Sequence, residues 1–205
     1  MDSVSYFPGM TLPSVILASH SPRRAELLRQ LIPDFGVVDS HAHESEDATL
    51  GSRRLCELNA KRKALLVAER YPDHLVLGAD TLVFLDELPL AKPADLDDAR
   101  RMLGCLSGRI HEVITGVCLV HKSANRMQVF TDVTRVKFRR LDPASIEAYL
   151  ARVHVLDKAG AYAAQEHGHI ILEAIEGSFT NVVGLPLEAL RIALAKWGTP
   201  NGSSR

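Results

Sequence analysis

Cysteine, aromatic residues and net charge are all scarce in this sequence. Of its 205 residues three are cysteine and 5% are aromatic, and the formal net charge is −1. Cys56, Cys105 and Cys118 form no C-x-x-C pair, so the sequence predicts buried thiols in a reducing compartment. A near-neutral chain without an aromatic stacking platform gives little support for RNA binding, and no nucleic-acid partner is expected.

Long apolar runs are absent as well. No stretch approaches the length of a membrane span. Residues 1–13 lack the charged start and apolar stretch of a signal peptide. Residues 198–205 are rich in Gly, Ser, Asn and Pro, which is typical of a disordered tail. We therefore expect a cytoplasmic protein with no membrane partner, a flexible extension over 1–13, a single folded domain over 14–197 and a disordered tail.

Several well-known site motifs are also missing. The chain contains no G-x-S-x-G, no Walker loop and no G-x-G-x-x-G, which argues against hydrolase-elbow, P-loop and Rossmann sites. His41 with His43, and His167 with His169, have an alternating spacing that could bind a transition metal. Neither pair has a nearby cysteine or a third histidine at a usual zinc spacing, so we do not expect a metal at either pair.

What the sequence does contain is an alternation of strand and helix patterns. Apolar residues make up 46% of the chain, enough for one large domain or two small lobes. Strands and helices intermix with a hairpin, which predicts an α/β fold with a mixed central sheet and flanking helices. The predicted strands are residues 15–18, 75–79, 111–121, 127–138 and 170–175, and the predicted helices are 22–31, 53–70, 95–106, 143–152 and 187–197.

Two details of this pattern bear on the site. The leucines of the second helix, Leu55, Leu58, Leu65 and Leu66, are expected to face inward. The strand over 75–79 is expected to end at Asp80, because its apolar run stops there. Ligands of α/β sheets bind beyond the carboxyl ends of strands, so we expect the turns over 19–24 and 78–81 to border the site.

The turn over 19–24 has the residues of an anion site. Ser21 suits the helix N-cap and Pro22 the first helical position. Arg23 and Arg24 then fall in the first helical turn, where the helix dipole disfavours cations. Backbone N–H groups, hydroxyls and two arginines together favour a bound polyanion. Taken alone, the stretch is equally compatible with an ordinary capped helix and solvated arginines.

Further charged residues along the chain complete a candidate hydrolytic site. Asp80 follows a buried strand, a common position for a catalytic or metal-binding carboxylate, although a turn aspartate that caps backbone is the simpler alternative. Glu44 offers a second carboxylate for a divalent metal. Hydrolysis of a phosphoanhydride needs neutralised charge, a metal and a base for water. The candidate phosphate donors are Ser21, Arg23, Arg24, Lys63, Lys92 and Lys158.

Six motifs in this order resemble those of the Maf family of nucleoside-triphosphate pyrophosphatases, and they extend from about residue 14 to 197. They are Leu17-Ala-Ser-His-Ser-Pro-Arg-Arg24, Gly78-Ala-Asp-Thr81, Lys92-Pro93, Leu106-Ser-Gly108 with His111 and Thr115-Gly116, Asp157-Lys-Ala-Gly-Ala-Tyr162, and Glu176-Gly-Ser-Phe-Thr-Asn-Val-Val-Gly-Leu-Pro186. The resemblance implies an elongated, two-lobed fold with a cleft, similar in shape to inosine-triphosphate pyrophosphatases.

The resemblance also implies an activity. Such an enzyme cleaves between the α and β phosphates and releases a nucleoside monophosphate and pyrophosphate, with a divalent cation such as Mg²⁺ or Mn²⁺. By position, Asp80 matches the catalytic base. The family's positions for phosphate or metal contacts are occupied here by Ser21, Arg24, Glu44, Lys63 and Lys92. A homodimer is the expected assembly.

The family has at least two substrate branches. Arg23, Thr81 and Gln165 match the branch that acts on dTTP and UTP, whereas the 7-methyl-GTP branch has Trp, Gln and Glu there. Some residues depart from the family pattern: Ala163 and Glu166 replace glycines, which stiffens the backbone and adds a negative charge, and Asn59 stands where alanine is typical. The alternatives are a 7-methyl-GTP pyrophosphatase and a non-catalytic, nucleotide-binding regulator of cell division.

Overall fold

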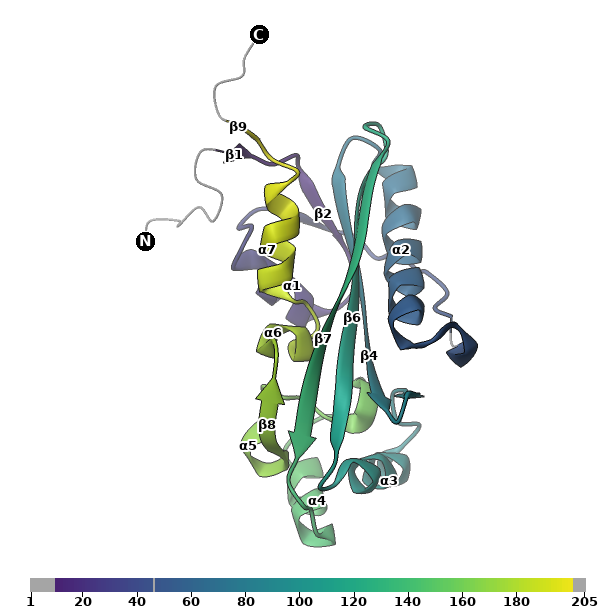
Figure 1. Cartoon of the computed structure of the whole chain (residues 1–205), viewed down its shortest axis with the longest axis vertical. Helices are drawn as coiled ribbons and strands as arrows, with labels where there is room; N and C mark the ends of the chain where they lie inside the picture. Colours follow the sequence, from purple (N-terminus) through teal and green to yellow (C-terminus); the bar gives the residue numbers. More distant parts are fainter. Residues whose placement is uncertain (1–9, 46, 201–205) are drawn as a thin grey trace.

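The computed structural model describes residues 10–45 and 47–200 and shows an elongated α/β molecule (Figure 1). Its framework is a seven-stranded mixed sheet in the order β3-β2-β4-β6-β7-β8, with β5 paired to β4. Strand β2 runs parallel to β3 and β4, and the other pairs are antiparallel. The predicted fold class is confirmed. The strands are β2 Val15–Ala18, β3 Gly36–Val37, β4 Leu75–Leu85, β5 Leu88–Leu90, β6 Ile110–His121, β7 Arg126–Phe138 and β8 Leu172–Glu176.

Helices cover both faces of one half of the sheet. Because side chains alternate along a strand, Leu75 and Leu77 pack with α1 and α7, while Val76 packs with α2 on the other side. Figure 1 shows α1 and α7 on one side of the strands and α2 on the other. The helices are α1 Pro22–Arg29, α2 Ser52–Arg70, α3 Leu96–Leu106, α4 Pro143–Leu150, α5 Gly168–Ile171, α6 Phe179–Val183 and α7 Leu187–Ala195, with 3-10 turns at Ala48–Leu50 and Ala159–Ala161.

The prediction for the inward face of α2 is wrong in part. Leu55 is buried, but Leu58 and Leu65 are only partly buried and Leu66 is exposed. Small residues turn inward instead, because the helix lies almost against the sheet. A methyl group on Gly78 would stand 2.4 Å from the Ala60 carbonyl oxygen. The close approach leaves no room for leucine where Ala60 and Ala64 face Gly78.

Strand β4 also differs from the prediction. It does not end at Asp80 but continues to Leu85, so residues 78–81 form no turn. Asp80 pairs with Gly116 and Thr81 with Thr115 of β6, and the ladder keeps the strand extended through these polar positions. The carboxylate therefore projects from the middle of the sheet rather than from its edge. The segment 170–175 differs too, since Gly168–Ile171 is helical and strand β8 begins at Leu172.

The ends of the domain and the thiols complete the comparison. Met10–Thr11 (β1) pairs with Thr199–Pro200 (β9), so these parts of the predicted loose segments are paired; residues 1–9 and 201–205 lie outside the described residues.

Cys56 and Cys118 are buried as predicted, and burial raises the pKa of each thiol to about 12, but Cys105 is exposed. Over residues 10–45 and 47–200, the structure contains no helix of the length and apolar character that crossing a bilayer requires.

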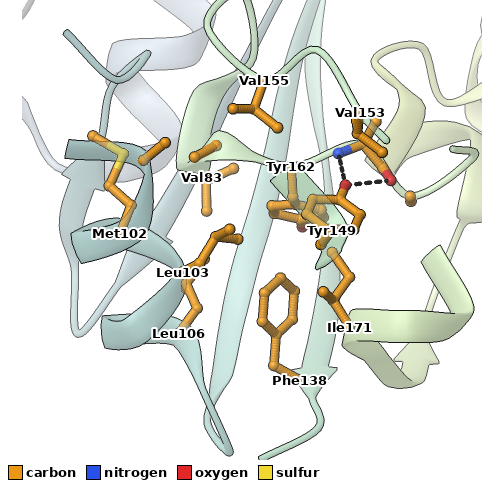
Figure 2. Packing of buried hydrophobic residues seen from close by; sticks show 14 of the residues in the cluster. Val83, Met102, Leu103, Leu106, Phe138, Tyr149, Val153, Val155, Tyr162 and Ile171 are labelled. Carbon is orange, nitrogen blue, oxygen red and sulfur yellow. Dashed lines mark hydrogen bonds between the residues drawn. The ribbon is translucent and has the colours of Figure 1, made fainter. Parts of the chain in front are cut away.

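A second core packs the opposite half of the molecule, where α3, α4 and the chain over 153–164 meet the sheet (Figure 2). Tyr149 is fully buried, and its hydroxyl accepts from the backbone N–H of Ala163 and donates to the carbonyl of the same residue, at 2.9 and 3.2 Å. His111, Phe138 and Tyr162 pack edge to face. This core fixes the backbone of residues 161–164, which lead to Gln165.

His111 will make the protein less stable in acid. It is 2% exposed, and its Nε2 lies 2.8 Å from the Tyr162 hydroxyl. Burial lowers the pKa of His111 from 6.5 to about 4. Between these values the unfolded chain binds the proton and the folded chain does not, so the free energy of unfolding falls as the pH is lowered, by about 3 kcal/mol in total. Denaturant melts of wild type and His111→Gln at pH values across this range will show a shallower acid loss for the variant. Parallel pH curves would contradict this.

Candidate active site

A cleft of about 950 Å³ lies between the two halves of the molecule. Its walls come from the start of α1, the loop over 39–45, helix α2, strand β4 and the segments 89–92, 157–165 and 182–184. Every residue predicted for the site lines this cleft, although these residues come from segments far apart in the chain. These residues are Ser21, Arg23, Arg24, Glu44, Lys63, Asp80, Thr81, Lys92, Lys158 and Gln165.

The floor of the cleft is formed by a buried carboxylate and a buried ammonium group. Asp80 is 3% exposed and Lys63 is 8% exposed. Lys63 Nζ lies 2.7 Å from Asp80 Oδ1 and 2.6 Å from Glu44 Oε1. Strand alternation turns Asp80 toward α2, and the close seating of α2 brings Lys63 to it. Two carboxylates thus converge on the Lys63 ammonium, while their predicted role as metal ligands stays a prediction.

Asn59, one helical turn before Lys63, holds the other oxygen of Asp80. Its side-chain Nδ2 donates to Asp80 Oδ2 at 3.2 Å and to the Ser45 carbonyl at 3.1 Å. Its Oδ1 accepts from the Ser45 backbone N–H at 2.7 Å. The amide is 1% exposed. It therefore ties the loop that carries Glu44 to the floor of the cleft.

Arg24 reaches from α1 to strand β4 and to the end of helix α6. Its Nε donates to the Gly184 carbonyl at 2.9 Å and its NH2 to Thr81 Oγ1 at 2.9 Å. Burial lowers the pKa of Arg24, and the nearby charges of Asp80 and Glu44 act in the opposite direction. An arginine is charged at any physiological pH, so the cleft contains a fixed guanidinium beside its carboxylates.

Ser21 and Arg23 occupy the start of α1 as predicted. Ser21 is the N-cap, and its Oγ accepts from the Arg24 backbone N–H at 3.4 Å. The Arg23 side chain is 28% exposed and reaches across the mouth of the cleft, where its NH1 lies 3.4 Å from Asp157 Oδ2. The two arginines thus occupy different positions, one held inside the cleft and one at its edge.

The ammonium group of Lys158, predicted to bind phosphate, is already paired within the protein. Lys158 is 6% exposed, and its ammonium lies 2.9 Å from Asp157 Oδ1 and 3.7 Å from Glu166 Oε1. It also donates to the His154 carbonyl. The negative charge that Glu166 adds is therefore paired within the protein. A phosphate contact by Lys158 stays a prediction, and it requires these bonds to be exchanged.

A family model described as Maf-like protein matches residues 14–197. This chain belongs to the Maf family. Maf relatives named dTTP/UTP pyrophosphatase include one from Akkermansia muciniphila, 45% identical over 176 residues, which covers 86% of this chain and 92% of the relative. Another, from Acetivibrio thermocellus, is 43% identical over 191 residues, with coverage of 90% and 95%. A third, from Gloeobacter violaceus, is 45% identical over 183 residues, with coverage of 89% and 95%.

The histidines of this Maf protein form no metal centre in the described part of the chain. No group of three or more His, Cys, Asp or Glu side chains there could hold an ion. His20 Nε2 and His41 Nδ1 both lie within 3.0 Å of Asp39 Oδ2 at the cleft mouth. The two carboxylates on Lys63, rather than the histidine pairs, are the place where oxygen ligands converge.

Some residues of the Maf site were not predicted as functional. Thr115 Oγ1 lies 2.9 Å from Thr81 Oγ1, and the Gly184 carbonyl accepts from Arg24. Asn181, fully buried, donates from Nδ2 to the Val113 carbonyl at 3.0 Å and so fixes the chain that leads to Gly184. Thr115 and Asn181 lie within the quoted motifs, but a backbone carbonyl such as that of Gly184 has no signal in sequence.

Proposed function

We propose that this Maf protein hydrolyses nucleoside triphosphates to a nucleoside monophosphate and pyrophosphate, with dTTP and UTP as preferred substrates. The observation that carries the proposal is the buried carboxylate of Asp80 on the floor of a cleft that also contains Arg24 and Lys63. The names of the relatives from Akkermansia and Acetivibrio support the substrate assignment.

The charges of the cleft suit a triphosphate. Its four negative charges need several fixed cationic donors, which stabilise the charge that moves onto the leaving pyrophosphate. Arg24 is held by Thr81 and Gly184, so its guanidinium is oriented before the substrate binds. Lys92 is exposed at the cleft wall and free to approach a phosphate from the opposite side.

In this mechanism Asp80 acts as the base for the attacking water. Its two oxygens are held by Lys63 and Asn59, at 2.7 and 3.2 Å, so the carboxylate has one orientation. Lys63 pairs with the carboxylate, and it is positioned to neutralise charge on a bound phosphate. The long, buried strand β4 prevents the group from swinging away.

A divalent cation such as Mg²⁺ or Mn²⁺ fits the same floor. Asp80 and Glu44 supply carboxylate oxygens that lie 2.7 and 2.6 Å from Lys63 Nζ, so two oxygen ligands already face one cationic position. Hard oxygen ligands are those that such ions prefer. A bound ion would supply charge neutralisation for the phosphates, and Asp80 and Glu44 would hold it.

Selection of the base is proposed for Arg23 and Gln165, which both line the cleft. Thr81, the third position of the dTTP/UTP branch, directs its hydroxyl to Arg24 and Thr115. The two hydrogen bonds between the Tyr149 hydroxyl and the Ala163 backbone stiffen the chain before Gln165. A cytoplasmic location accords with the free cysteines.

The resemblance also leads us to expect a homodimer. Analytical ultracentrifugation of the purified protein will measure its oligomeric state.

A panel of nucleoside triphosphates tests the proposal. Purified protein with Mg²⁺ or Mn²⁺ is incubated with each canonical nucleotide and with 7-methyl-GTP, and pyrophosphate and monophosphate are quantified. We expect dTTP and UTP to give the highest kcat/KM, because Arg23, Thr81 and Gln165 are those of that branch. Preferred turnover of 7-methyl-GTP would favour the alternative specificity. Tight nucleotide binding with no pyrophosphate would favour the non-catalytic regulator.

A further inference from the structure

The loop over 39–45 carries Glu44 but is held to the rest of the molecule mostly by exposed contacts. Asp39 bonds His20 and His41, whose side chains are 84% and 79% exposed. Arg70 donates to the Asp39 carbonyl at 2.9 Å, also on the surface. Such exposed contacts contribute little to holding a loop in place. The anchor next to Glu44 is of a different kind.

That anchor is the buried amide of Asn59. Its three hydrogen bonds agree with a single orientation of the side chain: Oδ1 meets a backbone donor at Ser45, and Nδ2 meets two acceptors, the Ser45 carbonyl and Asp80 Oδ2. Reversing the amide would place its oxygen against a carboxylate and a carbonyl, and would leave the Ser45 N–H without an acceptor. The orientation is therefore fixed by the chemistry of its neighbours.

On the basis of the proposed function, we infer that Asn59 is a positioning residue that couples the Glu44 loop to Asp80. The Asn59 amide forms hydrogen bonds with the Ser45 backbone, next to Glu44, and with one oxygen of Asp80. Lys63 contacts both the other Asp80 oxygen and Glu44 Oε1. Alanine at this position could make none of these bonds. This chain thus assembles its two carboxylates before any cation binds.

The expected consequence is a stronger hold on the divalent ion. When a site must first be assembled, its apparent affinity is reduced by the fraction of molecules in the assembled state. Outer residues that orient metal ligands typically change metal affinity or activity by 10–100-fold when they are replaced. Loss of the amide therefore raises the metal concentration that the enzyme needs for half-maximal rate.

The test compares wild type with Asn59→Ala and Asn59→Leu, the second of which preserves volume without hydrogen bonds. Cys56→Ala is the matched control, because Cys56 is fully buried on the same face of α2 and its thiol donates to the Ile114 carbonyl. Hydrogen exchange is measured over residues 39–45 in nucleotide-free protein. Pyrophosphate release is then titrated with Mn²⁺.

We expect both Asn59 variants to exchange faster over 39–45 and to need about tenfold more Mn²⁺ for half-maximal rate. The Cys56 control should match wild type in both. Unchanged exchange, or an unchanged Mn²⁺ requirement in an active enzyme, overturns the inference. If wild type releases no pyrophosphate, the proposed function fails, and loop exchange with Mn²⁺ affinity measured by electron paramagnetic resonance still decides the role of Asn59.

Discussion

Replacing Asp80 by asparagine will reduce pyrophosphate release by about three orders of magnitude while the fold stays intact. The amide keeps the size of the side chain but cannot accept a proton from water, and it removes a negative charge from the floor of the cleft. Lys63 retains Glu44 as a partner, at 2.6 Å, so its buried ammonium is not left alone. For this reason the loss is expected in kcat rather than in stability.

The measurement is steady-state pyrophosphate release with dTTP and UTP, together with circular dichroism and thermal melting. Asp97→Asn is the matched control, because Asp97 is 91% exposed on α3 and bonds only to a neighbouring arginine among the contacts described. A folded Asp80→Asn enzyme that keeps even a tenth of the wild-type rate would remove Asp80 from the mechanism.

The second large effect is expected from Gly116→Ala. A methyl group at this position would stand 2.4 Å from the carbonyl carbon and oxygen of Cys56, which are backbone atoms of α2 and cannot rotate away. The helix must shift outward, and overpacking of this kind costs about 3 kcal/mol. Gly116 pairs directly with Asp80 across the strands, so the shift also moves Lys63 and Asn59 away from the carboxylate.

Chemical denaturation will show this loss, and activity should fall with it. Gly104→Ala is the control, since nothing lies within 4 Å of the added methyl on the outer face of α3. That substitution should raise stability by about 0.5–1 kcal/mol, because alanine favours a helix more than glycine does. Equal stabilities of Gly116→Ala and wild type would show that α2 does not lie as close to Gly116 as the 2.4 Å distance to the Cys56 backbone indicates.

Much of the fold was predictable because its periodicity is strong. The hairpin of β6 and β7 lies within about one residue of the predicted strands, and α3 begins after its cap at Asp95, as the helix pattern indicated. The prediction of the inward face of α2 was wrong because leucine is usually the buried residue, whereas here the distance to the sheet selects alanine and cysteine. Strand β4 was cut short in prediction because Asp80 interrupts an apolar run.

The site shows the same division between sequence and structure. All ten predicted residues line one cleft, since the motifs that contain most of them were recognised in order. Their partners could not be foreseen. Lys158 is paired with Asp157 and Glu166, Thr81 turns to Arg24, and Asn59 reaches a loop fourteen residues earlier in the chain.

By itself, the sequence determined the α/β class, the Maf resemblance and the types of residue available for phosphate and metal, because periodicity and motifs are local. Only the tertiary structure decided which of these groups meet. The seating of α2 on Gly78 and Gly116 brings Lys63 and Asn59 to a carboxylate in the middle of a long strand. Such contacts depend on the spacing between elements, and residues distant in the chain set that spacing.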